Sequence, residues 1–204
     1  VLIVRSLTNV NEELLKDSSV KFVGTATIGT DHIDLEYLKK NNIAVADAKG
    51  CNAFSVAEYV LAALLELSVR FDFQLNSKSI GIVGAGNVGS KVADFANALG
   101  MKVLLNDPPL KRSGDKRKFV DLDEIIKCDI ISLHTPLNAE GIDKTFHLFD
   151  LNLLNKIKDE TVIINTSRGA VINNKALLDV IIKKKIKIVL DLSLIHISEP
   201  TRPY

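Results

Sequence analysis

The sequence predicts an α/β protein built on a doubly wound parallel sheet, and three observations support this. Short runs rich in Val and Ile alternate with amphipathic stretches along nearly the whole chain. These runs do not alternate with polar residues, as expected for strands that are covered on both faces. Strand and helix follow one another in strict order, which requires right-handed crossovers and therefore a parallel sheet.

The apolar runs define the predicted strands, and the amphipathic stretches between them define the predicted helices. The predicted strands are Val1–Val4, Phe22–Gly24, Ile43–Ala46, Ser79–Val83, Lys102–Asn106, Asp129–Leu133, Thr161–Asn165 and Ile186–Leu190. The predicted helices are Asn11–Lys16, Leu35–Asn41, Phe54–Ser68, Asn87–Leu99, Leu122–Lys127, Leu151–Lys156 and Asn173–Lys184.

The long predicted helix Phe54–Ser68 and the polar stretch that follows it divide the chain. Three strands precede this helix, which predicts a partial, flavodoxin-like α/β domain over residues 1–54. Five strands follow it, close to a complete Rossmann nucleotide-binding domain over residues 55–191. The first domain is short for an independent unit, so we expect part of it to be missing.

Composition excludes several functional classes. The chain is 47% hydrophobic and 25% charged, as in ordinary globular proteins. Its net charge of +1 argues against a nucleic-acid or membrane-surface partner. No apolar run reaches the roughly 18 residues of a membrane span. The two cysteines, Cys51 and Cys128, fit neither a metal site nor a secreted disulfide framework, and no histidine pair has metal-ligand spacing. We therefore expect a cytoplasmic protein without a metal.

A glycine motif, Gly84-x-Gly86-x-x-Gly89, lies between a predicted buried strand and a predicted helix. In this context Gly84 permits a tight turn, Gly86 lets a pyrophosphate approach the backbone, and Gly89 lets the helix pack closely on the strand. The free amides at the helix start would then bind the phosphates. The motif therefore predicts a dinucleotide-binding loop.

Asp107 follows the next predicted strand, 18 residues beyond Gly89. A carboxylate at this place binds the ribose hydroxyls of NAD and repels the additional phosphate of NADP. The alternative is that Asp107 only caps the Asp-Pro-Pro turn. Lys111 and Arg112 lie nearby and keep NADP open as a second possibility.

A second group of polar residues follows two later strands, where a doubly wound sheet forms its ligand crevice. Arg168 can bind a carboxylate and orient a 2-hydroxy acid toward a nicotinamide, although an Arg-Gly pair also occurs in surface turns. Thr135 can hydrogen-bond a cofactor, and the neighbouring His134 is a weak candidate for an acid–base group.

Together these motifs resemble the NAD-dependent D-2-hydroxyacid dehydrogenases over residues 1–191. The glycine motif, the acid, the His-Thr-Pro turn and the Arg-Gly pair resemble the family in general. Four further segments resemble the branch that oxidises 4-phospho-D-erythronate in pyridoxal 5'-phosphate biosynthesis. They are Arg5–Asn11, Lys21–His32, Gly50–Ala53 and Asp107–Pro109.

The resemblance implies a role for each matching residue. Ser6 and Thr27 match positions that bind the phosphorylated 2-hydroxy acid, and Arg168 matches the catalytic arginine. The implied cofactor contacts are Gly84, Gly86, Asn87, Val88, Gly89, Asp107, Thr135, Thr166 and Asp191. In the family, hydride passes from C2 to the nicotinamide while a histidine, made more basic by a paired glutamate, takes the hydroxyl proton. The full-length form is expected to be a homodimer.

The sequence departs from the family after Asp191. There the family continues toward the glutamate and histidine, whereas residues 192–204 read LSLIHISEPTRPY. We interpret this tail as a translated sequencing adapter and do not assign His196 and Glu199 to the catalytic pair. We therefore expect a chain truncated at both ends that turns over no substrate, since loss of a general base alone costs roughly 10²–10⁴ in rate.

Three alternatives remain open at this stage. The first is a sister dehydrogenase for another acid, such as 3-phosphoglycerate or glycerate. The second is a non-catalytic NAD-sensing module, which would need a chain that ends near Asp191 and an exposed apolar patch. The third, a Rossmann domain without any ligand, is hard to reconcile with three intact motif glycines together with Asp107 and Arg168.

Overall fold

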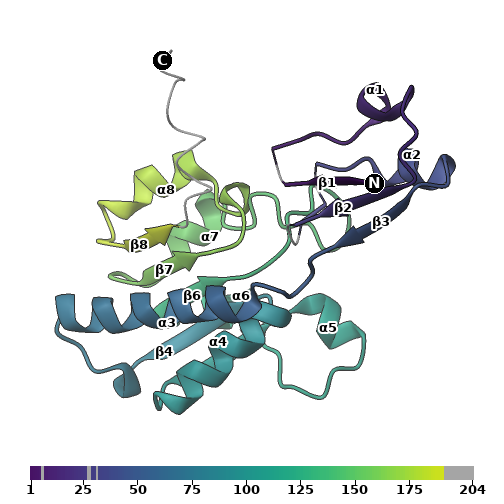
Figure 1. The fold of residues 1–204 in the computed structure, drawn as a ribbon. Helices are drawn as coiled ribbons and strands as arrows, with labels where there is room; N and C mark the ends of the chain where they lie inside the picture. The colour runs from purple at the N-terminus through teal and green to yellow at the C-terminus, as the bar shows by residue number, and fades with distance from the viewer. Residues whose placement is uncertain (6, 27–28, 31, 191–204) are drawn as a thin grey trace. The chain divides into compact units, whose positions relative to one another are not determined.

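The computed structural model describes residues 1–5, 7–26, 29–30 and 32–190. Within it the chain divides into two compact units, Val1–Asn52 and Ala53–Tyr204. Each unit has its own parallel β-sheet with helices between successive strands (Figure 1). The predicted α/β class with a doubly wound parallel sheet is confirmed.

The first unit contains a three-stranded parallel sheet with the strand order β1-β2-β3. Its elements are β1 (Leu2–Val4), α1 (Glu12–Leu15), β2 (Phe22–Thr25), α2 (Leu35–Lys40) and β3 (Ala44–Asp47). Both helices begin at a side-chain cap, because Asn11 accepts a hydrogen bond from the Leu14 amide and Asp34 accepts one from the Tyr37 amide. Val23 of β2 and Leu38 of α2 are buried in its core.

The second unit contains a five-stranded parallel sheet with the order β5-β4-β6-β7-β8. The strands are β4 (Ser79–Val83), β5 (Lys102–Asn106), β6 (Ile130–Leu133), β7 (Val162–Asn165) and β8 (Lys187–Leu190). Every strand predicted from the apolar runs is present, and its ends lie within one residue of the prediction.

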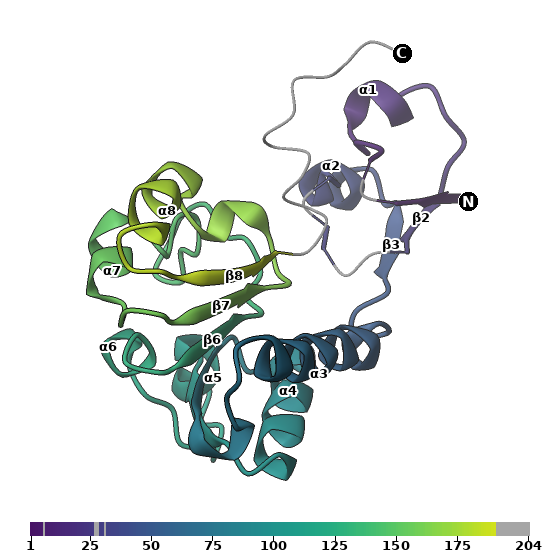
Figure 2. The same ribbon diagram turned by 90° about the vertical axis from the view of Figure 1, so that its left-hand side faces the viewer.

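Helices cover both faces of this sheet, as Figure 2 shows. On one face lie α3 (Ala53–Arg70) and α4 (Asn87–Ala98); on the other lie α6 (Leu122–Ile125), α7 (Leu151–Lys156) and α8 (Asn174–Ile181). Successive side chains of a strand point to opposite faces. Ile130 accordingly packs with α3 and α4, while Ile131 packs in the cluster on the other face. Two apolar cores explain why the strands carry no polar alternation.

Three short helical segments were not predicted from the sequence. They are α5 (Pro108–Arg112) and the 3₁₀ turns η1 (Leu75–Ser77) and η2 (Gly169–Val171). The signal for α5 was present in the sequence, because an Asp followed by Pro is typical of a helix start. The Asp107 side chain caps α5 by accepting a hydrogen bond from the Leu110 amide.

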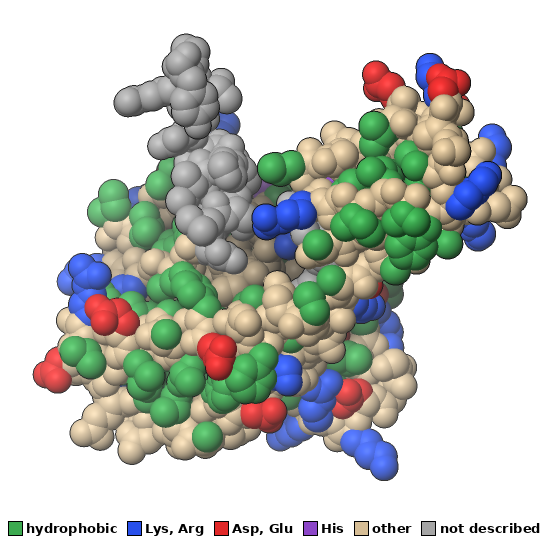
Figure 3. Space-filling model, in the orientation of Figure 1, with side chains coloured by type: hydrophobic (Ala, Val, Ile, Leu, Met, Phe, Trp, Pro, Cys, Tyr) green, Lys and Arg blue, Asp and Glu red, His purple; other side chains and the backbone are tan. Residues whose placement is uncertain are grey.

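The outer face of α3 is apolar. Tyr59, Leu65 and Val69 are exposed there, and Figure 3 shows hydrophobic side chains gathered over this helix with acidic groups between them. Among the described residues, α3 and the other helices lack the combination of length and apolar character that crossing a membrane requires.

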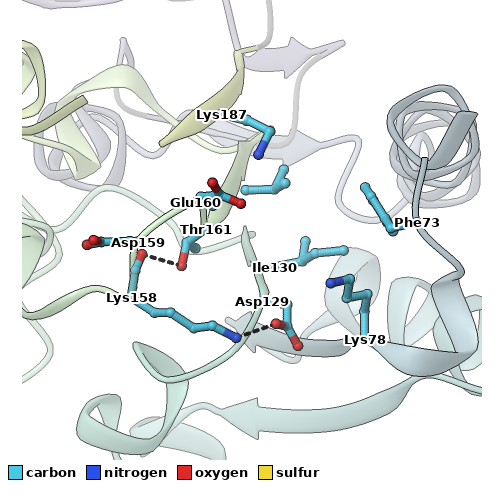
Figure 4. A pocket seen from close by; sticks show the side chains of 10 residues that line it. Phe73, Lys78, Asp129, Ile130, Lys158, Asp159, Glu160, Thr161 and Lys187 are labelled. Atoms are coloured by element: carbon cyan, nitrogen blue, oxygen red, sulfur yellow. Dashed lines mark hydrogen bonds and ion pairs between the residues drawn. The ribbon is translucent and has the colours of Figure 1, made fainter. Parts of the chain in front are cut away.

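An ion pair between Asp129 and Lys158 lies at the amino-terminal edge of the second sheet. Asp129, just before β6, accepts hydrogen bonds from the amide and the hydroxyl of Ser79 at 2.9 and 2.7 Å. Lys158 donates to its other oxygen beside a cavity of about 160 Å³ (Figure 4). Burial raises the pKa of Asp129, but the hydrogen bonds from Lys158 and Ser79 outweigh it and lower the pKa to about 2. The carboxylate therefore stays charged and ties β4 to β6.

We expect Asp129→Asn to lower the free energy of unfolding by about 1–3 kcal/mol, because one amide hydrogen-bond donor must then face Lys158 or Ser79. The native pKa is depressed below the unfolded value of 3.8. The contribution is therefore complete above about pH 4 and disappears as the pH falls toward 2. Urea unfolding at pH 7 and pH 2.5 measures both effects. Asp179→Asn, a charge-matched change on the exposed face of α8, serves as the control; an Asp129→Asn variant as stable as wild type at pH 7 would contradict the assignment.

Candidate functional site

From the strand order of the second unit, the ligand crevice is expected beside the carboxyl end of β4. From β4 the chain moves outward to β5 and then crosses back to β6 on the opposite side. The loops after β4 and β6 diverge at this topological switch point, where doubly wound sheets bind their ligands. The His134 amide donates a hydrogen bond to the Val83 carbonyl at 2.8 Å, so the two loops begin side by side.

The three motif glycines have different environments. Gly84 adopts a φ of +88°, and a Cβ atom there would lie 2.7 Å from the His134 carbonyl oxygen. A Cβ atom on Gly89 would collide with the Gly84 carbonyl oxygen, so only glycine allows the helix to pack this closely. Around Gly86, in contrast, the described residues other than its two chain neighbours place no atom within 4 Å of the Cβ position. The loop is therefore closed by packing on one side and open beside Gly86.

The start of α4 presents backbone amides to this open side. The first intrahelical bond runs from the Ser90 amide to the Gly86 carbonyl at 3.0 Å. The amides of Asn87, Val88 and Gly89 therefore have no acceptor within the helix, and within the described part of the chain no side chain caps the helix start. A pyrophosphate fits this arrangement, because helix amides and the helix dipole both favour an anion.

Asp107 lies at the end of β5, beside the glycine loop. One carboxylate oxygen accepts the Ala85 amide at 2.8 Å, and the other accepts the Leu110 amide at 3.0 Å. The side chain therefore caps α5 and contacts the glycine loop at the same time. The capping role given as an alternative for Asp107 is thus compatible with a place beside the dinucleotide-binding loop. Each carboxylate oxygen has a further lone pair with which it can accept a ribose hydroxyl.

Lys111 and Arg112, the two cations that kept NADP as an alternative, are paired with other acids. Arg112 donates to both carboxylate oxygens of Asp143 at 2.5 Å, and the Lys111 ammonium lies 3.6 Å from Asp121. Because these carboxylates offset the cations that would bind a 2'-phosphate, the charge of Asp107 dominates this corner of the site. The arrangement favours NAD over NADP.

His134 links β6 to β7 and is uncharged. Its Nε2 atom lies 2.9 Å from the Ser132 hydroxyl, and its Nδ1 atom lies 2.9 Å from the Thr166 hydroxyl. Burial lowers the pKa of His134 to about 3. Both ring nitrogens contact hydroxyl groups, and the ring does not bind a proton at neutral pH. His134 therefore connects the two loops rather than transferring protons, which agrees with its description as a weak acid–base candidate.

Thr135 carries a buried hydroxyl with an unused hydrogen-bonding capacity. Its Oγ1 atom is buried and has no hydrogen-bond partner among the described residues. Leaving such a group unpaired costs about 1–3 kcal/mol. Because Thr135 directly follows His134 at the carboxyl end of β6, the orphaned oxygen fits a ligand bound in the crevice. Thr166 lies on the adjacent loop, with its hydroxyl already in contact with His134.

Asn165, which was not predicted to have a role, shapes the loop that carries Arg168. The buried Asn165 side chain donates to the Arg168 carbonyl at 3.1 Å and accepts from the amide and the hydroxyl of Ser167 at 2.9 and 2.7 Å. Arg168 itself is half-buried and donates to the Ser167 carbonyl. An Asn at the end of a predicted strand is a sequence signal for such a turn, because its side chain can accept the amide two residues further on.

The second unit thus brings the glycine motif, Asp107, Thr135 and Thr166 to the carboxyl edge of one sheet, and Arg168 lies on the same edge. The predicted substrate residues Ser6 and Thr27 and the predicted cofactor contact Asp191 lie outside the described residues. The same holds for the tail 192–204.

Comparison with known proteins identifies the relatives of this chain. Residues 61–196 match the NAD binding domain of the D-isomer specific 2-hydroxyacid dehydrogenases. The chain is 51% identical over 179 residues to the erythronate-4-phosphate dehydrogenase of Pseudoalteromonas atlantica, covering 87% of this chain and 48% of that protein. It is 50% identical over 194 residues to the enzyme of that name from Shewanella loihica, covering 94% and 52%. The chain therefore spans about half the length of these curated relatives.

Solved structures show the same fold. The D-lactate dehydrogenase of Aquifex aeolicus in complex with NAD and lactic acid is 31% identical, with a TM-score of 0.77 over 98% of this chain and 68% of that one. The NAD-bound 3-phosphoglycerate dehydrogenase of Entamoeba histolytica is 28% identical, with a TM-score of 0.79 over 93% and 63%. The prediction of a Rossmann NAD-binding domain is confirmed.

We expect the ring of His134 to stay neutral in the folded chain between pH 8 and pH 5, because burial holds its pKa near 3. The unfolded chain binds a proton at this site near pH 6.5, so the fold loses stability as the pH falls from 6.5 toward 3. The pH dependence of the ring carbon and proton shifts in the NMR spectrum measures this. The same titration in 8 M urea is the control, and a folded-state midpoint above pH 5 would contradict the assignment.

Proposed function

The chain belongs to the D-isomer specific 2-hydroxyacid dehydrogenase family. We propose that it is part of an enzyme that oxidises the C2 hydroxyl of 4-phospho-D-erythronate, with NAD as the hydride acceptor. This reaction is a step of pyridoxal 5'-phosphate biosynthesis, and we place it in the cytoplasm. One observation supports the assignment of the substrate. The chain is about half identical to erythronate-4-phosphate dehydrogenases over 87–94% of its length, against 28–31% for D-lactate and 3-phosphoglycerate dehydrogenases of the same fold.

The geometry of the second unit supports the cofactor part of this proposal. We assign the amides at the start of α4 to the pyrophosphate and Asp107 to the ribose hydroxyls. The Thr135 hydroxyl, which has no partner among the described residues, would gain one in the complex. The full set of proposed contacts is Gly84, Gly86, Asn87, Val88, Gly89, Asp107, Thr135, Thr166 and Asp191.

Arg168 is the proposed catalytic residue of this chain. Its guanidinium would bind the substrate carboxylate through two parallel hydrogen bonds and so orient C2 for hydride transfer. Ser6 and Thr27 are proposed to bind the phosphorylated substrate. His134 is not assigned to proton transfer, because its burial keeps it neutral and both ring nitrogens contact hydroxyls.

We further propose that the enzyme is a homodimer and that the apolar outer face of α3 contributes to its interface. Tyr59, Leu65 and Val69 expose 45%, 46% and 80% of their surface on this helix. Several large apolar side chains exposed on one helix are a feature of contact sites between protein chains.

We expect Asp107→Asn to weaken NAD binding about tenfold or more and to narrow the preference over NADP by a similar factor. The reason is that the amide keeps the size of the side chain but removes the charge that repels a 2'-phosphate. Calorimetric titration of the purified chain with both cofactors measures the change. Asp179→Asn on α8 is the charge-matched control, and an unchanged ratio of the two affinities would contradict the role of Asp107.

The substrate proposal can be tested in a chimera in which residues 1–190 of this chain replace the matching half of the Pseudoalteromonas atlantica relative. We expect the chimera to reduce NAD with 4-phospho-D-erythronate and to prefer this acid over 3-phosphoglycerate and D-lactate by at least about 100-fold in kcat/KM. In the same chimera Arg168→Lys should lower kcat/KM by about 100-fold, because an ammonium loses the paired hydrogen bonds. Formation of NADH is followed by absorbance.

Controls in the chimera separate loss of function from loss of fold. Thermal melting and NAD affinity should stay unchanged in the Arg168→Lys chimera, since Arg168 is assigned to the substrate. A folded chimera that prefers another 2-hydroxy acid would transfer the assignment to a sister dehydrogenase. A folded chimera that binds NAD and oxidises none of the three acids would refute the enzymatic proposal.

A further inference from the structure

Arg117 lies in the segment after α5 and connects this segment to the glycine loop. Two of its nitrogens form a fork with Asp115, with Nε–Oδ1 at 2.9 Å and Nη2–Oδ2 at 2.7 Å. The remaining nitrogen, Nη1, donates to the Ala85 carbonyl at 2.9 Å and lies 2.8 Å from the Ser90 hydroxyl. One guanidinium thus reaches a residue within the motif and a residue in the first turn of α4.

Ala85, the residue between the first two motif glycines, is held from both sides. Its amide donates to Asp107 at 2.8 Å, and its carbonyl accepts hydrogen bonds from Arg117 and from the Ser90 hydroxyl, the latter at 2.8 Å. Ala85 is also almost fully buried. The orientation of both peptide planes around this residue is therefore determined by side chains from outside the motif.

The direction of the Ala85 carbonyl determines the direction of the Gly86 amide. Both groups belong to one planar trans peptide, in which C=O and N–H point in opposite directions. Since the carbonyl points toward Arg117, the Gly86 N–H points away from it. Gly86 is also the motif glycine that has open space around its Cβ position.

The ion pair between Arg117 and Asp115 is stable at neutral pH and has a defined geometry. The hydrogen bonds from the side chain and the amide of Arg117 lower the pKa of Asp115 to about 2, so the pair is ionised at any physiological pH. The guanidinium carbon also lies 5.4 Å from the centre of the Phe119 ring. Fork geometry and ring contact together fix the direction of Nη1.

We propose that Arg117 is a positioning residue for the pyrophosphate of the cofactor. Arg117 acts by holding the Ala85 carbonyl, so that the Gly86 N–H points toward the pyrophosphate. This inference rests on the proposed NAD binding and adds a residue that lies outside the glycine motif. It differs from a simple attraction between a cation and a phosphate, because the positive charge is paired with Asp115 and four of the five guanidinium N–H donors are used by Asp115, Ala85 and Ser90.

The test compares ligands with and without phosphates in chains with altered Arg117. Arg117→Met keeps the aliphatic stem and removes every donor. We expect it to weaken NAD and ADP binding about tenfold or more, and to leave adenosine affinity within about twofold, since adenosine has no pyrophosphate. Calorimetry measures NAD and ADP, and NMR titration measures adenosine. Arg112→Met, which removes a neighbouring cation paired with Asp143 rather than with the loop, should change none of the three.

Amide hydrogen exchange supplies a readout that does not depend on ligands. In the Arg117→Met variant, exchange of the Ala85 and Ser90 amides should accelerate about tenfold or more, while the amides of β7 keep their wild-type rates. If this variant does not fold, Arg117→Lys provides the same comparison. A lysine keeps the charge but cannot serve Asp115, Ala85 and Ser90 together, so it should also lose ADP affinity.

The outcomes separate this proposal from its rivals. Equal losses of affinity for ADP and adenosine would show that Arg117 has a general structural role, and would overturn the proposal. Full ADP affinity in the Arg117→Lys variant would also overturn it, because it would show that the positive charge alone is sufficient. Unchanged ADP affinity in the Arg117→Met variant would also refute it. A wild-type chain that binds neither NAD nor ADP would remove the cofactor assignment as well, whereas the substrate assignment is tested separately in the chimera.

Discussion

The backbone of Gly84 lies against the carbonyl of His134 where β4 and β6 end, and the geometry of the site depends on this close approach. The hydrogen bond between the His134 amide and the Val83 carbonyl holds the two strands together up to this point. A side chain at position 84 would separate them, because its Cβ atom would lie 2.7 Å from the carbonyl oxygen. The start of α4 and the Thr135 hydroxyl consequently belong to the same crevice.

Charged groups contact the glycine loop, and a neutral imidazole lies between the ends of β6 and β7. Asp107 accepts the Ala85 amide, and Arg117 donates to the Ala85 carbonyl. His134 bridges Ser132 and Thr166 without a charge, because burial suppresses its protonation. A buried charge in its place would need a partner that the apolar cores on both faces of the sheet do not offer.

The fold of the second unit is shared with dehydrogenases for several acids, so it does not by itself determine the substrate. The NAD-binding elements are those of the whole family and match over residues 61–196. The extended identity to erythronate-4-phosphate dehydrogenases, which is too long to be confined to the second unit, carries the specific proposal.

The sequence by itself determined the strands, the main helices, the glycine motif and the acid at Asp107, because apolar periodicity and turn chemistry are local properties. Only the tertiary structure decided which side chains meet. Arg117 contacts Ala85 across 32 positions, His134 contacts Thr166 across another 32, and neither pairing has a local signal. Both contacts depend on the order in which parallel strands lie side by side, and that order follows from packing helices on both faces of the sheet. The same packing leaves His134 neutral and Thr135 without a partner among the described residues.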